Sequence, residues 1–179
     1  MRETAGRILV YDGLPIRALY HSTCGGRTAA VEEVLDRPPA PYLRSVPDRA
    51  PDGTDWCAIS PRYRWTARFE NVTIDGAVKD EVAKMFGVAP ETLGEVDEIR
   101  VLDRTPSGRV RDVAIRGPHT EIVVSRLDIR FALRDPESGG ILGSTDFEIE
   151  RDLRDSMATT LYSGTSDIQR NIIARYLGL

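Results

Sequence analysis

The chain is organised around YHSTCGGRT, a short polar stretch at residues 20–28. An apolar run, ILVY at residues 8–11, precedes it, and Asp12-Gly13 separates that run from a second one at residues 15–20. Asp-Gly between two apolar runs is typical of a β-hairpin. The second strand of this hairpin is therefore expected to carry the polar stretch to a turn.

The turn itself is predicted at the glycine pair. Gly25 and Gly26 can take positive φ and let another backbone or a ligand come close. His21, Ser22 and Cys24 would then present nucleophilic and metal-binding groups beside the turn. The alternative is a plain β-turn in which serine and threonine hydroxyls bond to their own backbone, and the spacing alone leaves both open.

Composition limits the class of protein. The length of 179 residues and the hydrophobic fraction of 41% are enough for one core with an appendage. The net charge of −4 gives no general attraction to nucleic acid or to an anionic membrane. No run approaches the ~20 apolar residues of a membrane span. The start of the chain has no apolar signal core, so an exported protein would carry its signal outside this chain.

The remaining pattern predicts an α+β fold, with an antiparallel or mixed sheet and one or two packed helices. Strands are expected near residues 99–102, 110–116 and 121–124, and a helix over 74–86 that Gly87 ends. Basic and aromatic residues alternate over 62–69, which suits base stacking but better fits a half-buried strand in an acidic chain.

The pattern changes at Arg151, after which β-patterning disappears. Helices are expected over 152–161 and from residue 165 or 166, as a C-terminal helical pair. Ser125 is expected to cap a short helix that precedes this region.

Residues from about 4 to 150 resemble the SpoIID/LytB (stage II sporulation protein D) family. The resemblance depends on several separate motifs, which occur in the same order as in that family. They are GRILVY (6–11), YHSTCGGRT (20–28), PYLRSV (41–46), CAISPRYRW (57–65), RVL (100–102) with TPSGRV (105–110), and IRFAL (129–133) with LGSTDF (142–147).

The resemblance implies a peptidoglycan-associated domain of the cell envelope or periplasm. Members of that family cleave glycan strands as lytic transglycosylases, and enhancers of amidases carry the same domain. The general acid of the family is a Glu upstream of the strand where this chain begins, so no catalytic residue is assigned here. The implied partner is a peptidoglycan glycan strand, and the implied glycan-binding residues are His21, Ser22, Cys24, Gly25, Gly26 and Thr28.

Residues from about 150 to 179 instead resemble the C-terminal end of acyl-CoA dehydrogenases, through ERDLRD (150–155) and LYSGTSDIQRNIIAR (161–175). Ser163 stands where many members have the Glu that removes the α-proton of the substrate. The resemblance implies contact of FAD with Gly164, Thr165, Ser166 and Asp167.

Two domains are therefore predicted, 1–150 and 151–179. The alternative functions are a flavin-dependent dehydrogenase remnant and a non-catalytic chimeric protein, with a homo-oligomer formed through the C-terminal helix.

The two cysteines leave a further choice open. His21, Cys24 and Cys57 could share a zinc ion with His119 or an Asp as the fourth ligand. A Cys24–Cys57 disulfide is the alternative, and no other cofactor is expected of the first domain. Metal analysis with and without chelator, together with a thiol titration, separates the two.

Overall fold

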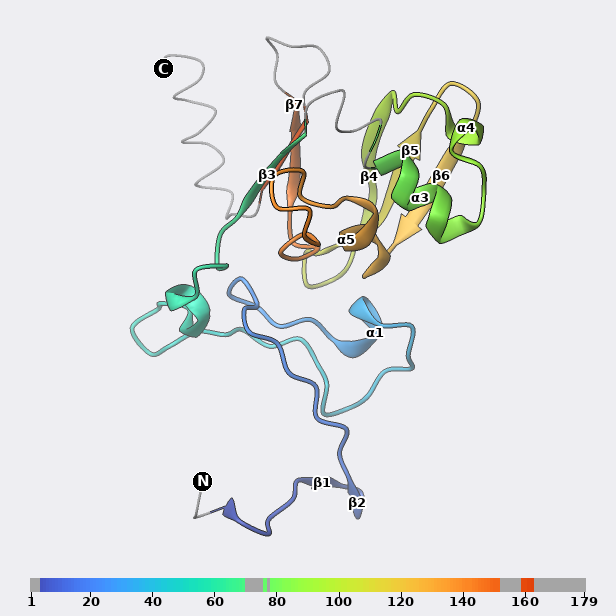
Figure 1. Cartoon of the computed structure of the whole chain (residues 1–179). Coiled ribbons are helices and arrows are strands. Elements are labelled where there is room, and N and C mark those ends of the chain that lie inside the picture. Colours follow the sequence, from blue (N-terminus) through green and yellow to red (C-terminus); the bar gives the residue numbers. More distant parts are fainter. Residues whose placement is uncertain (1–3, 70–75, 77, 152–158, 163–179) are drawn as a thin grey trace.

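The computed structural model describes residues 4–69, 76, 78–151 and 159–162. The predicted α+β class is confirmed. Two three-stranded antiparallel sheets, a two-stranded hairpin and several short helices make up the described part of the chain. Figure 1 shows the sheets together at one end of the molecule and the β1–β2 hairpin at the other.

The first sheet has the strand order β4 (Glu98–Arg104), β5 (Val110–Arg116) and β6 (Glu121–Ser125). Ile99 on β4 lies opposite Ile115 on β5. Ile99, Val113, Ile115 and Val124 of these strands belong to the apolar core. Ala114 of the central strand, between two of them, is buried as well. The three strands predicted from the sequence are therefore confirmed.

The second sheet has β8 (Thr159–Tyr162) in the middle, antiparallel to β3 (Thr66–Phe69) and to β7 (Glu148–Arg151). The helix predicted over 152–161 is thus wrong for its last residues, which form β8. Two threonines, a leucine and a tyrosine suit a strand, and β3 and β7 supply backbone partners on both sides. Residues 152–158 and 163–179 lie outside the described residues, and with them the rest of the predicted helical pair.

Helices cover the sheets at one side. α3 (Lys79–Phe86) has acidic residues in its first turn and ends at Gly87, which takes the left-handed conformation with φ 65°. α4 (Pro90–Leu93) begins with a proline at its first position. α3, with eight residues, is the longest described helix, and no described helix has the length and apolar character needed to span a membrane.

α5 (Asp128–Ala132) is the short helix predicted after β6, but Ser125 does not cap it. Leu127 occupies the N-cap position, and the Ser125 hydroxyl donates a hydrogen bond to Asp112 at 2.6 Å. The Ser125 hydroxyl therefore bonds to Asp112 on the neighbouring strand, and not to the first turn of the helix as the sequence predicted.

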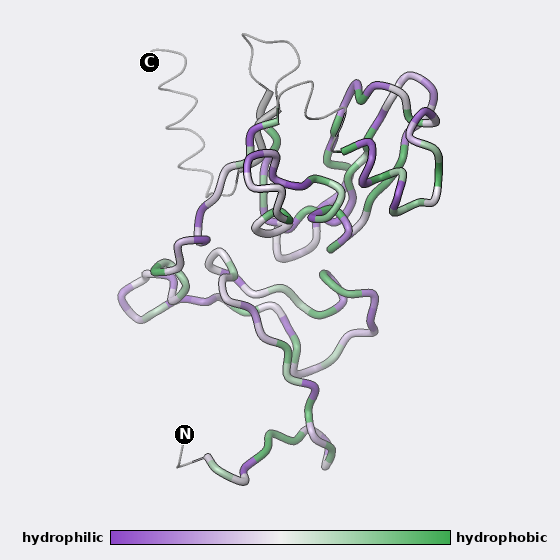
Figure 2. The backbone as a smooth tube through the Cα atoms, in the orientation of Figure 1, coloured by the Kyte–Doolittle hydropathy of each residue, from purple (hydrophilic) through white to green (hydrophobic). Residues whose placement is uncertain are grey.

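One apolar core joins the two sheets, α3 and α5. Phe147 packs edge-on against Trp65, with ring centroids 6.2 Å apart. Figure 2 shows that hydrophobic segments run through this part of the chain and also through the N-terminal hairpin, whose apolar side chains are exposed. The largest fully buried side chains are Phe69, Phe147, Leu93, Ile115, Ile129, Leu133, Leu142, Val78, Val82, Val110 and Val113.

The N-terminal hairpin is shorter than predicted. β1 (Val10–Tyr11) pairs with β2 (Leu14–Pro15) through a turn in which Asp12 and Gly13 both have positive φ. The second strand ends at Pro15, whose missing N–H cannot extend the ladder. Residues 16–26 follow outside any strand, so the hairpin does not deliver the polar stretch to its turn. Further on lie α1 (Val31–Val34) and η2 (Trp56–Ile59).

Candidate functional site

The glycine pair forms the predicted turn. Gly25 and Gly26 have φ values of 76° and 105°. A Cβ on Gly25 would lie 2.9 Å from a carboxylate oxygen of Asp146, and a Cβ on Gly26 would overlap the carboxylate of Asp55. Both positions therefore combine positive φ with a close approach, and the approaching groups are carboxylates of the chain itself.

Arg109 holds this turn against the sheets. Its side chain is largely buried and donates hydrogen bonds to the carbonyl oxygens of Cys24, at 2.8 Å, and Arg27, at 2.9 Å. The guanidinium also lies 3.8 Å from Asp146. Since Arg109 directly precedes β5, the turn is fixed to the central strand of the first sheet.

Two thiols and a carboxylate meet below the turn. The Cys24 thiol donates a hydrogen bond to Asp48 at 2.9 Å, and its sulfur lies 3.3 Å from that of Cys57. Both cysteines are free thiols. Burial is the main cause that raises the pKa of Cys24 from 9.0 to about 12, and the Asp48 carboxylate adds to it. Hydrogen bonds from the two cysteines lower the pKa of Asp48.

The predicted zinc ligands are only partly brought together. Ligand atoms of Cys24, Asp48 and Cys57 lie within 4.8 Å of one another, and His21 is not part of that group. His119 is in the connection between β5 and β6. It lies against Gly94 and lines neither cavity of the site. Two thiolates and a carboxylate would fit three positions of a tetrahedral zinc site, so zinc stays a prediction.

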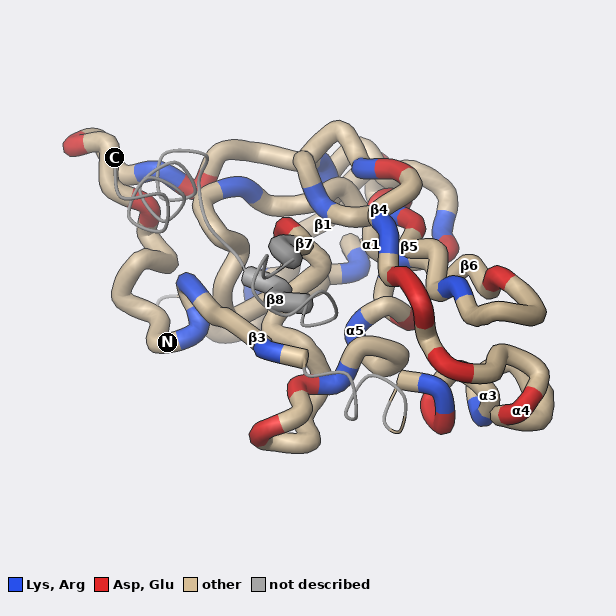
Figure 3. Tube along the Cα trace, turned by 90° about the horizontal axis from the view of Figure 1, so that it is seen from above, with Lys and Arg blue, Asp and Glu red and all other residues tan. Residues whose placement is uncertain are grey.

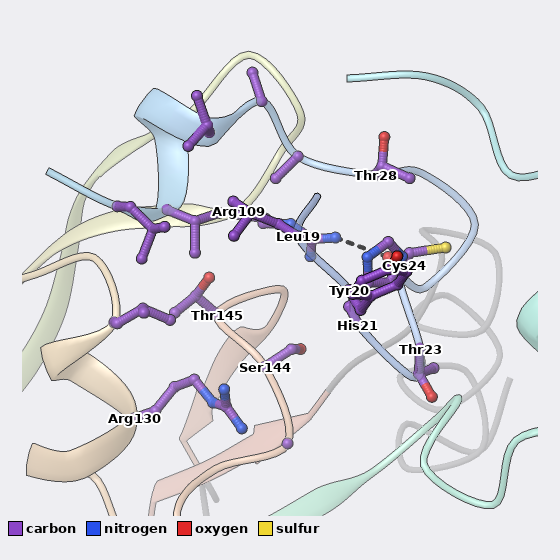
Figure 4. Close-up of a pocket in the computed structure, with 17 residues that line it drawn as sticks. Leu19, Tyr20, His21, Thr23, Cys24, Thr28, Arg109, Arg130, Ser144 and Thr145 are labelled. Carbon is purple, nitrogen blue, oxygen red and sulfur yellow. Dashed lines mark hydrogen bonds between the residues drawn. The ribbon is translucent and has the colours of Figure 1, made fainter. Parts of the chain in front are cut away.

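Two cavities that share part of their linings lie beside the turn, and Figure 4 shows the first of them. The first, of about 350 Å³, has a mostly apolar wall made by the segment from Ala29 to Leu35 and by Leu127 of the β6–α5 connection. The second, of about 250 Å³, has a mostly polar wall. The residues shared by both linings are Tyr20, His21, Thr23, Cys24, Arg130, Gly143 and Ser144.

The sequence-predicted glycan-binding residues are largely gathered here. His21 and Cys24 line both cavities, Ser22 and Gly25 line the polar cavity, and Thr28 lines the apolar cavity. Gly26 lines neither, because it faces Asp55 instead. The site therefore brings together five of the six residues named from the sequence.

The opposite wall was not assigned from the sequence. Figure 4 shows Arg130, Ser144 and Thr145 facing the turn residues across the apolar cavity, whereas Arg109 reaches over to the turn itself. Trp65 closes the polar cavity and donates a hydrogen bond from Nε1 to the Ser144 hydroxyl at 3.2 Å. The motif LGSTDF could have indicated this wall from the sequence. Its Gly143 has no side chain, and the Trp65 indole occupies the space that a side chain would fill.

Charge is spread over the molecule, and residues of both signs alternate along the described chain in Figure 3. The cavities differ from this average. Asp146 is the only carboxylate among the described residues of either lining, whereas Arg62, Arg109 and Arg130 all contribute cations. The site is therefore locally cationic in an acidic chain.

Comparison with protein families places most of this structure in one group. A family model described as a domain of unknown function, DUF8618, matches residues 52–164, which is more than half of the chain. The chain belongs to the DUF8618 family. The DUF8618 match begins after the glycine turn, includes Cys57, Arg130 and Ser144, and runs through β8. No curated protein matches the chain.

The flavin contacts implied by the second resemblance, Gly164, Thr165, Ser166 and Asp167, lie outside the described residues. The resemblances to SpoIID/LytB proteins and to acyl-CoA dehydrogenases both stay predictions, as does the division of the chain at residue 150.

Proposed function

We propose that the paired cavities bind a glycan strand of peptidoglycan. One observation carries this proposal. Motifs that are far apart in the chain, and on which the SpoIID/LytB resemblance depends, line the same cavities. The motif at 20–28 forms one wall, and the motifs at 129–133 and 142–147 form the other.

The walls suit an N-acetylated sugar. The polar cavity joins Trp65 and Tyr20, whose rings can pack on the face of a sugar, with the exposed hydroxyl of Ser22. The apolar wall around Ala30 and Val31 suits the methyl of an acetamido group. A polar cavity next to an apolar one can therefore hold the hydroxyl groups and the acetamido methyl of such a sugar at the same time.

The proposal is limited to binding. Cleavage of a glycosidic bond needs a proton donor at the leaving oxygen. Among the described residues of the two linings, Asp146 is the single carboxylate, and the guanidinium of Arg109 lies 3.8 Å from it. An ion pair is a poor setting for an acid that must donate a proton. A role at the cell wall follows from the proposed ligand.

Tryptophan fluorescence offers a direct test, because the chain has two tryptophans and only Trp65 lines a cavity. In a Trp56→Phe variant, titration with an N-acetylglucosamine tetramer should change the emission of Trp65. Tyr20→Ser should weaken binding about fivefold, since one aromatic contact contributes about 1 kcal/mol.

Tyr42→Ser is the matched control, because Tyr42 packs against Tyr11 and lines neither cavity. Sedimentation with purified sacculi should then rank the variants in the same order. A protein that stays in the supernatant and shows no fluorescence change would contradict the proposal, and so would equal losses in the two tyrosine variants.

A further inference from the structure

The polar cavity has an excess of cations. Its described lining contains the guanidiniums of Arg62 and Arg130 and one carboxylate, that of Asp146. The Asp146 carboxylate also faces Arg109, at 3.8 Å. Because the whole chain has a net charge of −4, this positive site is a local feature that bulk composition does not explain.

Arg130 is fixed at one nitrogen and leaves the rest of its guanidinium to the cavity. Its Nε donates a hydrogen bond to the carbonyl oxygen of Leu142 at 2.6 Å. Figure 4 shows the side chain extending from α5 into the cavity. Among the residues that the structure describes, no carboxylate forms an ion pair with Arg130 or Arg62.

The surroundings make this arrangement costly without an anion. Burial, and then the positive charge of Arg62, lower the pKa of Arg130. Both effects disfavour the charged guanidinium, which nevertheless stays protonated in proteins. A bound anion would remove the repulsion and satisfy the free N–H groups.

A purely structural role accounts for little of this. The bond to Leu142 uses one of the five N–H donors of Arg130 and requires no charge. Arg62 is exposed, and no described residue forms a hydrogen bond with its side chain, so no described hydrogen bond of the fold uses its charge. Two cations are therefore placed at one cavity without a structural need for either charge.

We propose that Arg62 and Arg130 form a subsite for a carboxylate group of the bound glycan. This inference rests on the proposed function, because it assigns the acidic group of that ligand to the polar cavity. A glycan strand of peptidoglycan offers such a group in two places, the lactyl ether of N-acetylmuramic acid and the peptide stem attached to it. Both present the same chemistry to a guanidinium.

A carboxylate fits this cavity better than a phosphate. The group is planar and carries one charge, which matches the flat donor edge of a guanidinium. Asp146 on the same wall would repel a dianion more strongly than a monoanion. The hydroxyl of Ser22, which lines the cavity and is exposed, is a further donor.

Three oligosaccharides of equal length test the subsite by calorimetry on the full chain. One is neutral, the N-acetylglucosamine tetramer. The second alternates N-acetylglucosamine with N-acetylmuramic acid and has free lactyl carboxylates. In the third the lactyl groups are amidated by stem peptides, so that the carboxylates lie on the peptide. We expect one acidic probe to bind about tenfold tighter than the neutral one at low salt. Which of the two it is shows whether the subsite binds the lactyl carboxylate or a carboxylate of the stem peptide.

Arg62→Gln and Arg130→Gln should each bring the ratio of acidic to neutral affinity close to one. Arg68→Gln is the control and should keep the wild-type ratio, because Arg68 is exposed on β3 and lines neither cavity. Arg62→Gln keeps the test valid even if loss of the Leu142 bond destabilises the Arg130 variant, and a thermal melt of each variant detects that case.

Equal affinity of wild type for all three probes would overturn the subsite while leaving glycan binding intact. Inorganic phosphate displacing the acidic probe at lower concentration than acetate would overturn the assignment to a carboxylate. No binding of any probe, the neutral one included, would overturn the proposed function and the subsite with it.

Discussion

The thiol of Cys24 is surrounded by groups that disfavour its ionisation. The side chain is 4% exposed, donates to the Asp48 carboxylate and lies beside a second thiol. A thiolate here would lose solvation and face a negative charge, which is why the pKa rises to about 12. Cys24, which lines both cavities of the proposed glycan site, is therefore expected to be an unreactive thiol at neutral pH.

A Cys57→Ser variant should reveal this directly, because Cys24 is then the only thiol. We expect alkylation of folded Cys24 at pH 8 to be slower than that of an ordinary thiol by a factor on the order of 1,000, and still to accelerate above pH 10. Asp48→Asn in the same background should raise the rate, since it removes the negative acceptor. The rate of iodoacetamide labelling by mass spectrometry measures both.

The same pKa has a consequence for stability. The folded state keeps the Cys24 proton up to about pH 12, whereas the unfolded state loses it near pH 9.0. The unfolded state therefore binds fewer protons between these values, and the free energy of unfolding falls as the pH rises through them. Rapid labelling of Cys24 in the folded protein at pH 8 would contradict the raised pKa, and with it this loss of stability at high pH.

Residue type alone identified one wall of the site. His21, Ser22, Cys24 and Gly25 stand together in the chain and have distinctive chemistry. Arg130 could not be found this way, because arginine is common in this chain and no local pattern marks a particular one. Only packing against Leu142 and the nearness of Arg62 distinguish it.

At the scale of the element, the glycine turn is shaped by two separate requirements. Gly26 has positive φ and is approached by the Asp55 carboxylate. Gly53 also has positive φ, of 88°, but open space surrounds the position of its Cβ. The pair separates the effect of backbone conformation from that of close packing.

Gly53→Ala should lower the free energy of unfolding by about 1 kcal/mol, the cost of a left-handed alanine. Gly26→Ala should lower it by about 3 kcal/mol, because the added methyl also displaces Asp55 from its bonds with Arg49 and Tyr63. Urea unfolding followed by circular dichroism measures both values. Equal losses in the two variants would show that the carboxylate moves aside freely.

Elements marked by local punctuation were predicted well. The bounds of β5 follow from the turn residues that flank an apolar segment on both sides, and α3 ends where Gly87 permits a left-handed residue. The hairpin was predicted at the correct turn but too long, since its second strand ends at Pro15. A strand without a third neighbour gains little from further pairing, and apolar sequence alone does not report that neighbour.

At the scale of the whole molecule, β8 connects the end of the described chain to its middle. It is the central strand between β3 and β7, so the second sheet combines segments from both sides of residue 150. The sequence change at Arg151 marks a difference in pattern, and the hydrogen bonding of the sheet continues across it.

A fragment ending at residue 150 would lack that central strand. We expect it to have a lower melting temperature than the full chain and to be cleaved by trypsin within β3, whose backbone donors and acceptors would lose their partners. Thermal melts and limited proteolysis of both chains measure this. A fragment as stable as the full chain would support the predicted division into two independent domains.

The sequence by itself determined the α+β class, the positions of the turns and one wall of the site, because backbone preferences and apolar periodicity act between near neighbours. The tertiary structure alone decided that residues 159–162 are a strand, that Asp48 rather than His21 joins the two thiols, and that Arg62 and Arg130 share a cavity. Those outcomes depend on hydrogen bonds, burial and repulsion between groups tens of residues apart, which no local pattern encodes.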